Sequence, residues 1–482
     1  MGSEKPLLED GYFAFVKEDC PTCTLIEPVL AQIAALGLLK AAYSQDNPNF
    51  PALEITKSDM DLEVSFKYEI DTVPTLIKVS NGEETERIVG WLKSEWEAFC
   101  GIDELDTTGI SEFSPGCGSR SVDPDLEPLL REKFGSGLRS RLVEFASRED
   151  EFEAMYELGW SDGLPVVPPT EDRVIEMLDG TSRSKDEIIA IVPPNLDPVT
   201  VEKIAVNAVM AGCRPEYLPV VISALEAVCT DEFNMHGLLA TTMPVGPVLF
   251  VNGPIRNEIG MNSGMNLLGQ GNRANSTIGR AVQLIIRNVG GGRPGEVDRA
   301  THGSPAKVGL CFAEDEEGSP WPSYSQDLGF GPDQNTVTVF PGEGPRVIVD
   351  QLSRFPDELA RSLAQGLIGN VHPKLVLGFD AILIISPEHA DRFKKAGWSK
   401  QEVNEAIISH TIRESDLLLR GVDGVAEGLD SGFAGLELPK FRPDSGLVIV
   451  YGGGRAGLFS TSIGGWLSGS KGSQYVTREI QI

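Results

Sequence analysis

The stretch Cys20-Pro21-Thr22-Cys23 is the part of this chain that decides how its first domain folds. An apolar run over residues 12–16 precedes it and predicts a buried strand, and an apolar pattern of helical period follows it over residues 25–36. The two thiols therefore stand at a strand-to-helix turn, which is typical of a dithiol redox site. Because the start of a helix stabilises negative charge, Cys20 is expected to be the exposed attacking thiolate and Cys23 the resolving thiol.

The residues that follow predict the rest of one small α/β unit. We expect strands at residues 40–43, 76–79 and 87–90, and helices at 61–68 and 93–99. Asn81-Gly82 lies between the last two strands and predicts a hairpin turn. Val73-Pro74-Thr75 leads into the strand at 76–79.

Together, the Cys-x-x-Cys motif and the Val-Pro-Thr segment resemble the thioredoxin family. In that family the proline of this segment has a cis peptide bond and lies against the disulfide, and the backbone of its neighbour pairs with the substrate strand. The resemblance gives Pro74 this role. It implies a thioredoxin-like domain over residues 6–102 that carries a redox-active disulfide between Cys20 and Cys23.

Two departures from the family pattern bear on the chemistry. Asp19 stands where the family usually has Trp, with Glu18 beside it, and Ala14 replaces the buried acid. Two nearby negative charges disfavour a thiolate, and loss of the acid removes a proton relay. We therefore expect Cys20 to react more slowly than a general reductant or to depend on a dedicated partner. A structural disulfide or half of a zinc site is the alternative interpretation.

Composition restricts the partners of the whole chain. Its 482 residues leave room for about three domains. The 41 basic and 71 acidic residues give a net charge of −30, which opposes binding to nucleic acid or to an anionic membrane surface. Seven cysteines suit a reducing compartment, and the N-terminus lacks a secretory pattern, so we expect a cytoplasmic protein. We also expect a homo-oligomer.

Beyond the first domain, the sequence predicts three further segments. Residues 103–124 are poor in large apolar side chains and are interpreted as a linker. Residues 125–180 are interpreted as a helical connector followed by an extended, proline-rich arm. In residues 181–482, strands alternate with amphipathic helices, which predicts a large α/β domain of two lobes.

Two glycine-rich loops of the large domain are candidate ligand sites. Residues 260–275 lie just before a predicted helix, and residues 452–457 follow a predicted buried strand. Their backbone N–H groups and arginines suit a small anionic substrate. The candidate binding residues are Asn262, Ser263, Gly271, Asn272, Arg273, Asn275, Gly453, Gly454 and Arg455. Tight turns without a ligand are the alternative.

Three further residues are candidates for chemistry. Cys213 lies between a helix end and a helix start, beside Arg214, which is expected to lower its pKa; burial in the core is the alternative. Cys117 lies between two glycines, so its sulfur should be accessible. His236 is a candidate general acid or base. The sequence offers no metal-ligand spacing, so no cofactor is expected beyond the redox-active disulfide.

Residues 115–482 weakly resemble uncharacterised bacterial proteins related to the family named for a UGSC motif, which contains selenocysteine. The resemblance lies in segments such as 159–170, 210–220, 260–281 and 452–466. The motif itself would fall at Cys117-Gly118-Ser119-Arg120, where Cys replaces selenocysteine and Arg replaces the final Cys. The family supplies no settled reaction, and this departure leaves Cys117 without a local resolving thiol.

These observations favour a thiol-dependent oxidoreductase. In this hypothesis the Cys20–Cys23 dithiol supplies electrons to a small-molecule site in the C-terminal α/β domain, Cys117 or Cys213 forms a mixed disulfide or substrate adduct, and a thiol reductant or reductase restores the dithiol. Two alternatives stay open. One is a non-catalytic thioredoxin-like adaptor fused to a ligand-binding domain. The other is a lyase or hydrolase whose redox module is protective.

Overall fold

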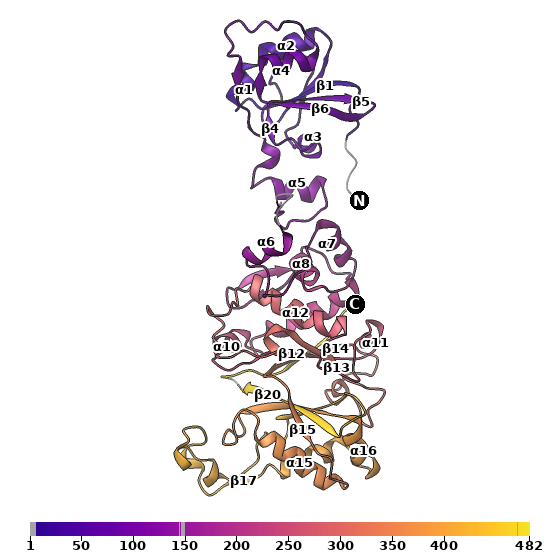
Figure 1. The fold of residues 1–482 in the computed structure, drawn as a ribbon, viewed down its shortest axis with the longest axis vertical. Coiled ribbons are helices and arrows are strands. Elements are labelled where there is room, and N and C mark those ends of the chain that lie inside the picture. The colour runs from indigo at the N-terminus through magenta and orange to yellow at the C-terminus, as the bar shows by residue number, and fades with distance from the viewer. Residues whose placement is uncertain (1–5, 144, 146–149, 470) are drawn as a thin grey trace. The chain divides into compact units, whose positions relative to one another are not determined.

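The protein is a mixed α/β chain that divides into two compact units, residues 1–144 and 145–482 (Figure 1). The computed structural model describes residues 6–143, 145, 150–469 and 471–482. Among these residues no helix has the length and apolar character needed to cross a membrane.

A five-stranded sheet forms the centre of the first unit, in the order β3-β2-β1-β5-β6. Strand β1 is parallel to β2 and antiparallel to β5, and β3 and β6 form the edges. The strands are β1 (Gly11–Val16), β2 (Leu39–Ser44), β3 (Thr56–Ser58), β5 (Thr75–Ser80) and β6 (Glu83–Val89). Asn81 and Gly82 join β5 to β6 with φ angles of 56° and 78°, so the predicted hairpin turn is confirmed.

Helices accompany this sheet where the sequence predicts them, with one break. The predicted helix over residues 25–36 is divided at Ile26, because Pro28 has no N–H with which to continue the first helix. Apolar side chains such as Phe13, Ile33 and Trp96 are buried in the shared core. The helices are α1 (Pro21–Leu25), α2 (Glu27–Ala35), α3 (Glu63–Lys67) and α4 (Lys93–Cys100).

The segment predicted as a linker is paired with the first unit along part of its length. Strand β8 (Phe113–Ser114) pairs with β7 (Trp91–Leu92), and β9 (Cys117–Gly118) pairs with β4 (Thr72–Val73). Backbone hydrogen bonds hold this segment, which explains why a composition poor in apolar residues suggested a linker instead. The 3-10 helix Arg120–Val122 and helix α5 (Glu127–Phe134) follow in the same unit.

An eight-stranded sheet forms the centre of the second unit. Its main path runs β13-β12-β14-β20-β16-β19, with β21 on β14 and β15 on β20. The strands are β12 (Gly246–Asn252), β13 (Leu310–Ala313), β14 (Thr336–Gly342), β15 (Arg346–Val349), β16 (Phe379–Ile385), β19 (Leu447–Tyr451), β20 (Phe459–Leu467) and β21 (Val476–Glu479).

The sheet consists of two halves with the same strand arrangement. In one half β12 is parallel to β13 and antiparallel to β14; in the other β16 is parallel to β19 and antiparallel to β20. The halves meet where Gly342 pairs with Gly465. The last strand of each half crosses over: β15 joins β20 of the later half, and β21 joins β14 of the earlier half.

Helices cover both halves. Among them, α8, α9 and α12 pack together beside β13 and β14, while α15, α16 and α17 pack beside β19 and β20 (Figure 1). The helices of this unit are α6 (Glu151–Glu157), α7 (Glu171–Leu178), α8 (Val201–Ala211), α9 (Leu218–Val228), α10 (Met235–Ala240), α11 (Ile255–Glu258), α12 (Arg273–Asn288), α13 (Ala306–Gly309), α14 (Tyr324–Asp327), α15 (Pro356–Ile368), α16 (Pro387–Lys395) and α17 (Lys400–Ser409). Two short antiparallel pairs join β10 (Ile188–Val192) to β11 (Asp197–Thr200), and β17 (Arg413–Glu414) to β18 (Glu437–Leu438).

Candidate functional site

The two thiols of the Cys-x-x-Cys motif lie together at the start of α1. Cys20 is the N-cap residue, and its sulfur accepts the backbone N–H of Cys23 at 3.5 Å. Cys20 and Cys23 lie 3.3 Å apart, and both are free thiols. The carbonyl oxygen of Val73 is 3.5 Å from the Cys20 sulfur. The residues needed for dithiol chemistry are therefore within contact distance of one another.

The surroundings move the pKa values of the two thiols in opposite directions. A hydrogen bond with the Cys23 side chain lowers the pKa of Cys20 to about 5; burial opposes this shift, while the Cys117 thiol and the N–H groups of Cys23 and Thr22 assist it. Burial raises the pKa of Cys23, and the neighbouring Cys20 adds to the effect. These shifts favour the thiolate at Cys20 and the protonated thiol at Cys23.

Two expectations about Cys20 are wrong. Its side chain is fully buried instead of exposed, because the segment that carries Cys117 lies over it. The acidic neighbours also fail to keep its pKa high. The Glu18 carboxylate accepts a hydrogen bond from Asn47 in an exposed position, and the backbone N–H groups of Glu18 and Asp19 donate to Asp46. Local hydrogen bonds to the sulfur outweigh these charges.

Pro74 lies where the sequence predicts, beside the thiols. The Val73–Pro74 peptide bond is cis, which confirms that expectation. The Pro74 carbonyl accepts the N–H of Gly90 at 2.8 Å, which attaches this turn to the strand that follows β6. The Val73 backbone is occupied by another part of the same chain, strand β9.

Cys117 lies in the dithiol site. Its backbone pairs with Val73, whose carbonyl oxygen lies 3.5 Å from the Cys20 sulfur, and the neighbouring Cys20 side chain raises the pKa of Cys117. This shift favours the protonated thiol at Cys117. Its side chain is half-buried, so the glycines on either side do not leave it fully accessible. Local sequence offers no reason to place Cys117 against Cys20. Its neighbour Pro115, whose carbonyl accepts the Thr22 hydroxyl, lies 93 positions from Thr22.

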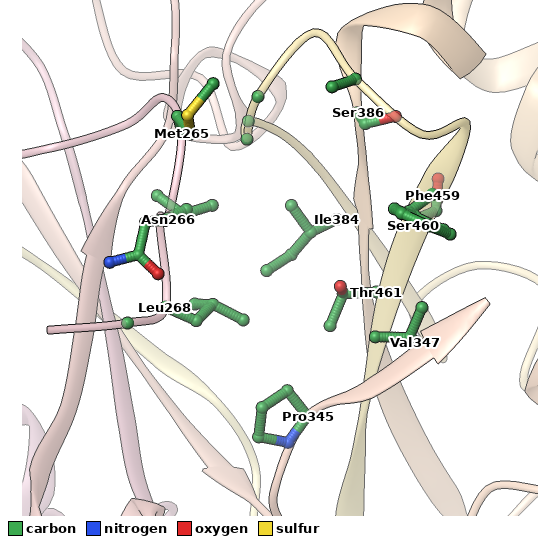
Figure 2. A pocket seen from close by; sticks show the side chains of 16 residues that line it. Met265, Asn266, Leu268, Pro345, Val347, Ile384, Ser386, Phe459, Ser460 and Thr461 are labelled. Atoms are coloured by element: carbon green, nitrogen blue, oxygen red, sulfur yellow. The ribbon is translucent and has the colours of Figure 1, made fainter. Parts of the chain in front are cut away.

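The two glycine-rich loops of the second unit meet at one pocket of about 590 Å³ (Figure 2). The N–H of Gly453 donates to the carbonyl of Ser263 at 2.9 Å, which joins the loops. Figure 2 shows Met265, Asn266 and Leu268 across the cavity from Val347 and the β20 residues. The described lining contains hydroxyl, amide and apolar groups and no charged side chain, so the pocket suits an uncharged, partly apolar ligand.

Most of the predicted binding residues in these loops have structural partners. The Asn275 side chain bonds the backbone N–H and carbonyl of Asn262, and Asn272 caps α12 through the N–H of Asn275. These amides fix the first loop. Gly453 and Gly454 do line the pocket, whereas Gly271 lies exposed in its loop.

The two arginines expected to bind an anion at these loops point elsewhere. Arg273 donates to the carbonyls of Gly212 and Cys213, and Arg455 is largely exposed, 3.8 Å from Asp391. Arg273 instead lines a separate pocket of about 420 Å³, whose other charged lining residues are Arg173, Arg214, Glu176 and Glu216. Three arginines against two glutamates make this pocket the more basic of the two.

The expected role of Cys213 is not supported by its surroundings. Its side chain is buried, and burial raises its pKa to about 12, although a hydrogen bond to Thr277 and the charge of Arg273 oppose the shift. Desolvation thus outweighs the helix start and the arginines. His236 is exposed on α10 and lines neither of these two pockets.

A histidine–serine pair at the larger pocket was missed. His389 on α16 is buried; its Nε2 lies 3.0 Å from the carbonyl oxygen of Asp350, which can only accept, so Nε2 carries the hydrogen. Nδ1 then accepts the hydroxyl of Ser460 at 2.8 Å. Burial lowers the pKa of His389 and keeps it neutral. The two residues are 71 positions apart, so local sequence carries no signal for the pair.

Comparison of the chain with protein-family models, with curated proteins and with solved structures found no match. Within the described part of the chain, no group of three or more His, Cys, Asp or Glu side chains is arranged to hold a metal ion.

Proposed function

We propose that the first unit is a thioredoxin-like thiol–disulfide oxidoreductase, with Cys20 as nucleophile and Cys23 as resolving thiol. The observation that carries the proposal is a pair of adjacent sulfurs whose pKa values are displaced in opposite directions. A thiolate beside a protonated thiol is the state from which dithiol exchange begins. Strand order and the cis bond at Pro74 are consistent with this fold.

The reaction transfers two electrons from the dithiol to a substrate disulfide. The Cys20 thiolate attacks one substrate sulfur, forms a mixed disulfide and releases the other as a thiolate. Cys23 loses its proton and attacks the Cys20 sulfur. The Cys20–Cys23 disulfide forms, and the second substrate thiolate leaves and is protonated. A thiol reductant or reductase, as a reducing cytoplasm provides, then restores the dithiol.

We further propose that the second unit binds the small molecule that this chemistry serves. The pocket between the glycine-rich loops suits an uncharged ligand, and the more basic second pocket, where Arg173, Arg214 and Arg273 lie with Glu176 and Glu216, is the alternative for an anion. In this proposal the dithiol reduces a disulfide or another oxidised sulfur of that ligand. The identity of this substrate and the transfer of electrons to it from the first unit are both part of the proposal.

The test is exchange activity with an aromatic disulfide as probe. Cys20→Ser should abolish the rapid reaction, while Cys23→Ser should retain the first step and accumulate a mixed disulfide. Cys100→Ser is the matched control, because Cys100 is a buried thiol for which burial raises the pKa to about 11. Wild-type rates in Cys20→Ser would overturn the proposal. A pair that stays reduced under mild oxidation would favour the non-catalytic adaptor instead.

The His389–Ser460 pair favours a second candidate for the second unit, a hydrolase in which Ser460 is the nucleophile. The hydroxyl donates to a neutral histidine of fixed tautomer at the wall of a pocket, which is the arrangement of an activated serine. A serine-reactive fluorophosphonate should then label the protein, and Ser460→Ala should remove the label. Ser386→Ala is the control, since Ser386 lines the same pocket. Absence of labelling would remove this candidate.

A further inference from the structure

We propose that Cys117 is a third redox thiol of the dithiol site, and that Cys20 forms a disulfide with Cys117 as well as with Cys23. The inference rests on the proposed exchange function and names the internal partner of that site. Its basis is the juxtaposition of Cys117 with Cys20: the Cys117 backbone is paired with Val73, whose carbonyl oxygen lies 3.5 Å from the Cys20 sulfur. The segment occupies the sheet edge beside the nucleophile as an extended peptide substrate would.

Specific contacts hold the segment on the N-terminal side of Cys117. The hydroxyl of Ser114 lies 2.7 Å from that of Thr22, inside the Cys-x-x-Cys motif, and Thr22 also donates to the Pro115 carbonyl. Gly116 is required by close approach, because a Cβ there would lie 2.3 Å from Thr72 Cγ2 and 3.0 Å from the Val73 oxygen. The backbone therefore fits against the site only with glycine before the cysteine.

Buried polar contacts hold the C-terminal side. The Ser119 N–H donates to the Asp71 carbonyl at 2.8 Å, and the Ser119 hydroxyl accepts from Gln45 Nε2 at 2.7 Å. Gln45 is fully buried, and its Oε1 accepts the N–H of Arg120. With anchors on both sides, Cys117 is held at a high effective concentration against Cys20.

The exchange steps balance. An external low-molecular-weight disulfide is attacked by the Cys20 thiolate, which yields a mixed disulfide and one small thiolate. Cys117 loses its proton and attacks the Cys20 sulfur, so the Cys20–Cys117 disulfide forms and the second small thiol leaves. Cys23, after losing its proton, then attacks Cys20; the Cys20–Cys23 disulfide forms and Cys117 is released and reprotonated. The last step moves a disulfide without net oxidation.

Trapping in the full-length chain tests the inference. Reduced Cys23→Ser protein is treated with oxidised glutathione, quenched with acid and mapped by mass spectrometry. We expect the Cys20–Cys117 disulfide to be the main product, and Cys23→Ser/Cys117→Ser to give Cys20 joined to glutathione. A Cys20–glutathione product with Cys117 free in the Cys23→Ser protein would overturn the inference.

A glycine pair provides a matched control that keeps all thiols except Cys23. In the Cys23→Ser background, Gly116→Ala should displace the segment and replace the internal disulfide by glutathionylated Cys20. Gly118→Ala should not, because a Cβ at Gly118 meets nothing within 4 Å. Equal yields of the internal disulfide in the two variants would contradict the docked geometry.

Failure of the inference and of the proposed function give different results. If wild-type protein forms Cys20–Cys23 but the Cys23→Ser variant never joins Cys20 to Cys117, only the inference fails. If Cys20 forms neither a disulfide with Cys23 nor an adduct with glutathione, the exchange function itself fails.

Discussion

The backbone of Cys117 pairs with that of Val73, whose carbonyl oxygen lies 3.5 Å from the sulfur of Cys20. A segment whose Ser114 and Pro115 hydrogen-bond Thr22 from 92 and 93 positions along the chain thus lies against the dithiol. Four predictions follow from this relationship and from the second unit's packing.

Replacing Cys117 should raise the pKa of Cys20. The neighbouring Cys117 side chain helps to lower the pKa of Cys20, so Cys117→Ala removes one interaction that favours the charged form. We expect the pKa of Cys20 to move from about 5 to about 6, the effect of one hydrogen bond to a charged group. Thiolate absorbance in the ultraviolet, followed against pH, measures it. Cys100→Ala should leave the curve unchanged, and an unchanged curve in Cys117→Ala would contradict the contact.

The stability of the first unit should depend on pH through the two motif thiols. Folding lowers the pKa of Cys20 from its usual 9.0 to about 5, so its contribution is complete above about pH 9 and is lost as pH falls towards 5. Folding raises the pKa of Cys23, so its contribution is complete below about pH 9 and is lost as pH rises further. The unfolding free energy of wild type minus that of Cys20→Ser should therefore increase between pH 5 and pH 8, by about 1–3 kcal/mol. Urea unfolding under reductant measures it, and a pH-independent difference would contradict the shift.

His389 should make the second unit less stable in mild acid. Burial lowers its pKa below the usual 6.5, so the unfolded chain binds the proton more readily, and stability is lost as pH falls below about 6.5. His389→Gln should weaken this dependence, by about 1 kcal/mol between pH 7 and pH 5. Thermal unfolding at the two pH values measures it. His236→Gln, at an exposed position, should retain the wild-type slope.

Gly465 should be essential where the two halves of the large sheet meet. A Cβ there would lie 2.8 Å from the Asp380 carbonyl and 3.0 Å from the ring of Phe340. We expect Gly465→Ala to destabilise the second unit by about 1–3 kcal/mol, as overpacking does. Gly378→Ala is the control, because its Cβ would meet nothing closer than 3.6 Å. Equal unfolding midpoints for the two variants would show that the junction tolerates a side chain.

Periodicity predicted the local elements well. The strand at 40–43 lies within β2, the hairpin at Asn81-Gly82 is present, and the predicted helix at 93–99 lies within α4. These elements depend on apolar spacing and turn residues, which are properties of neighbouring positions. The cis bond at Pro74 was predicted by resemblance and not by pattern.

Long-range packing explains what the sequence could not predict. Nothing near Cys117 indicates that it pairs with Val73, and nothing near His389 indicates Ser460. Cys213 shows the same limit in the opposite direction: the helix start beside Arg214 suggested a reactive thiol, but the tertiary structure buries it. Desolvation is set by the whole fold, so a local motif cannot reveal it.

The crossing of β15 and β21 makes each half of the large sheet depend on the other for its completion. Removing the last few residues would remove β21, which pairs with Thr336–Val339 of β14, a strand much earlier in the chain. The loss would leave an apolar strand edge with unpaired backbone groups. Truncations near the C-terminus should therefore cause aggregation through β14, a strand that is synthesised much earlier. The two halves of the sheet have to fold together.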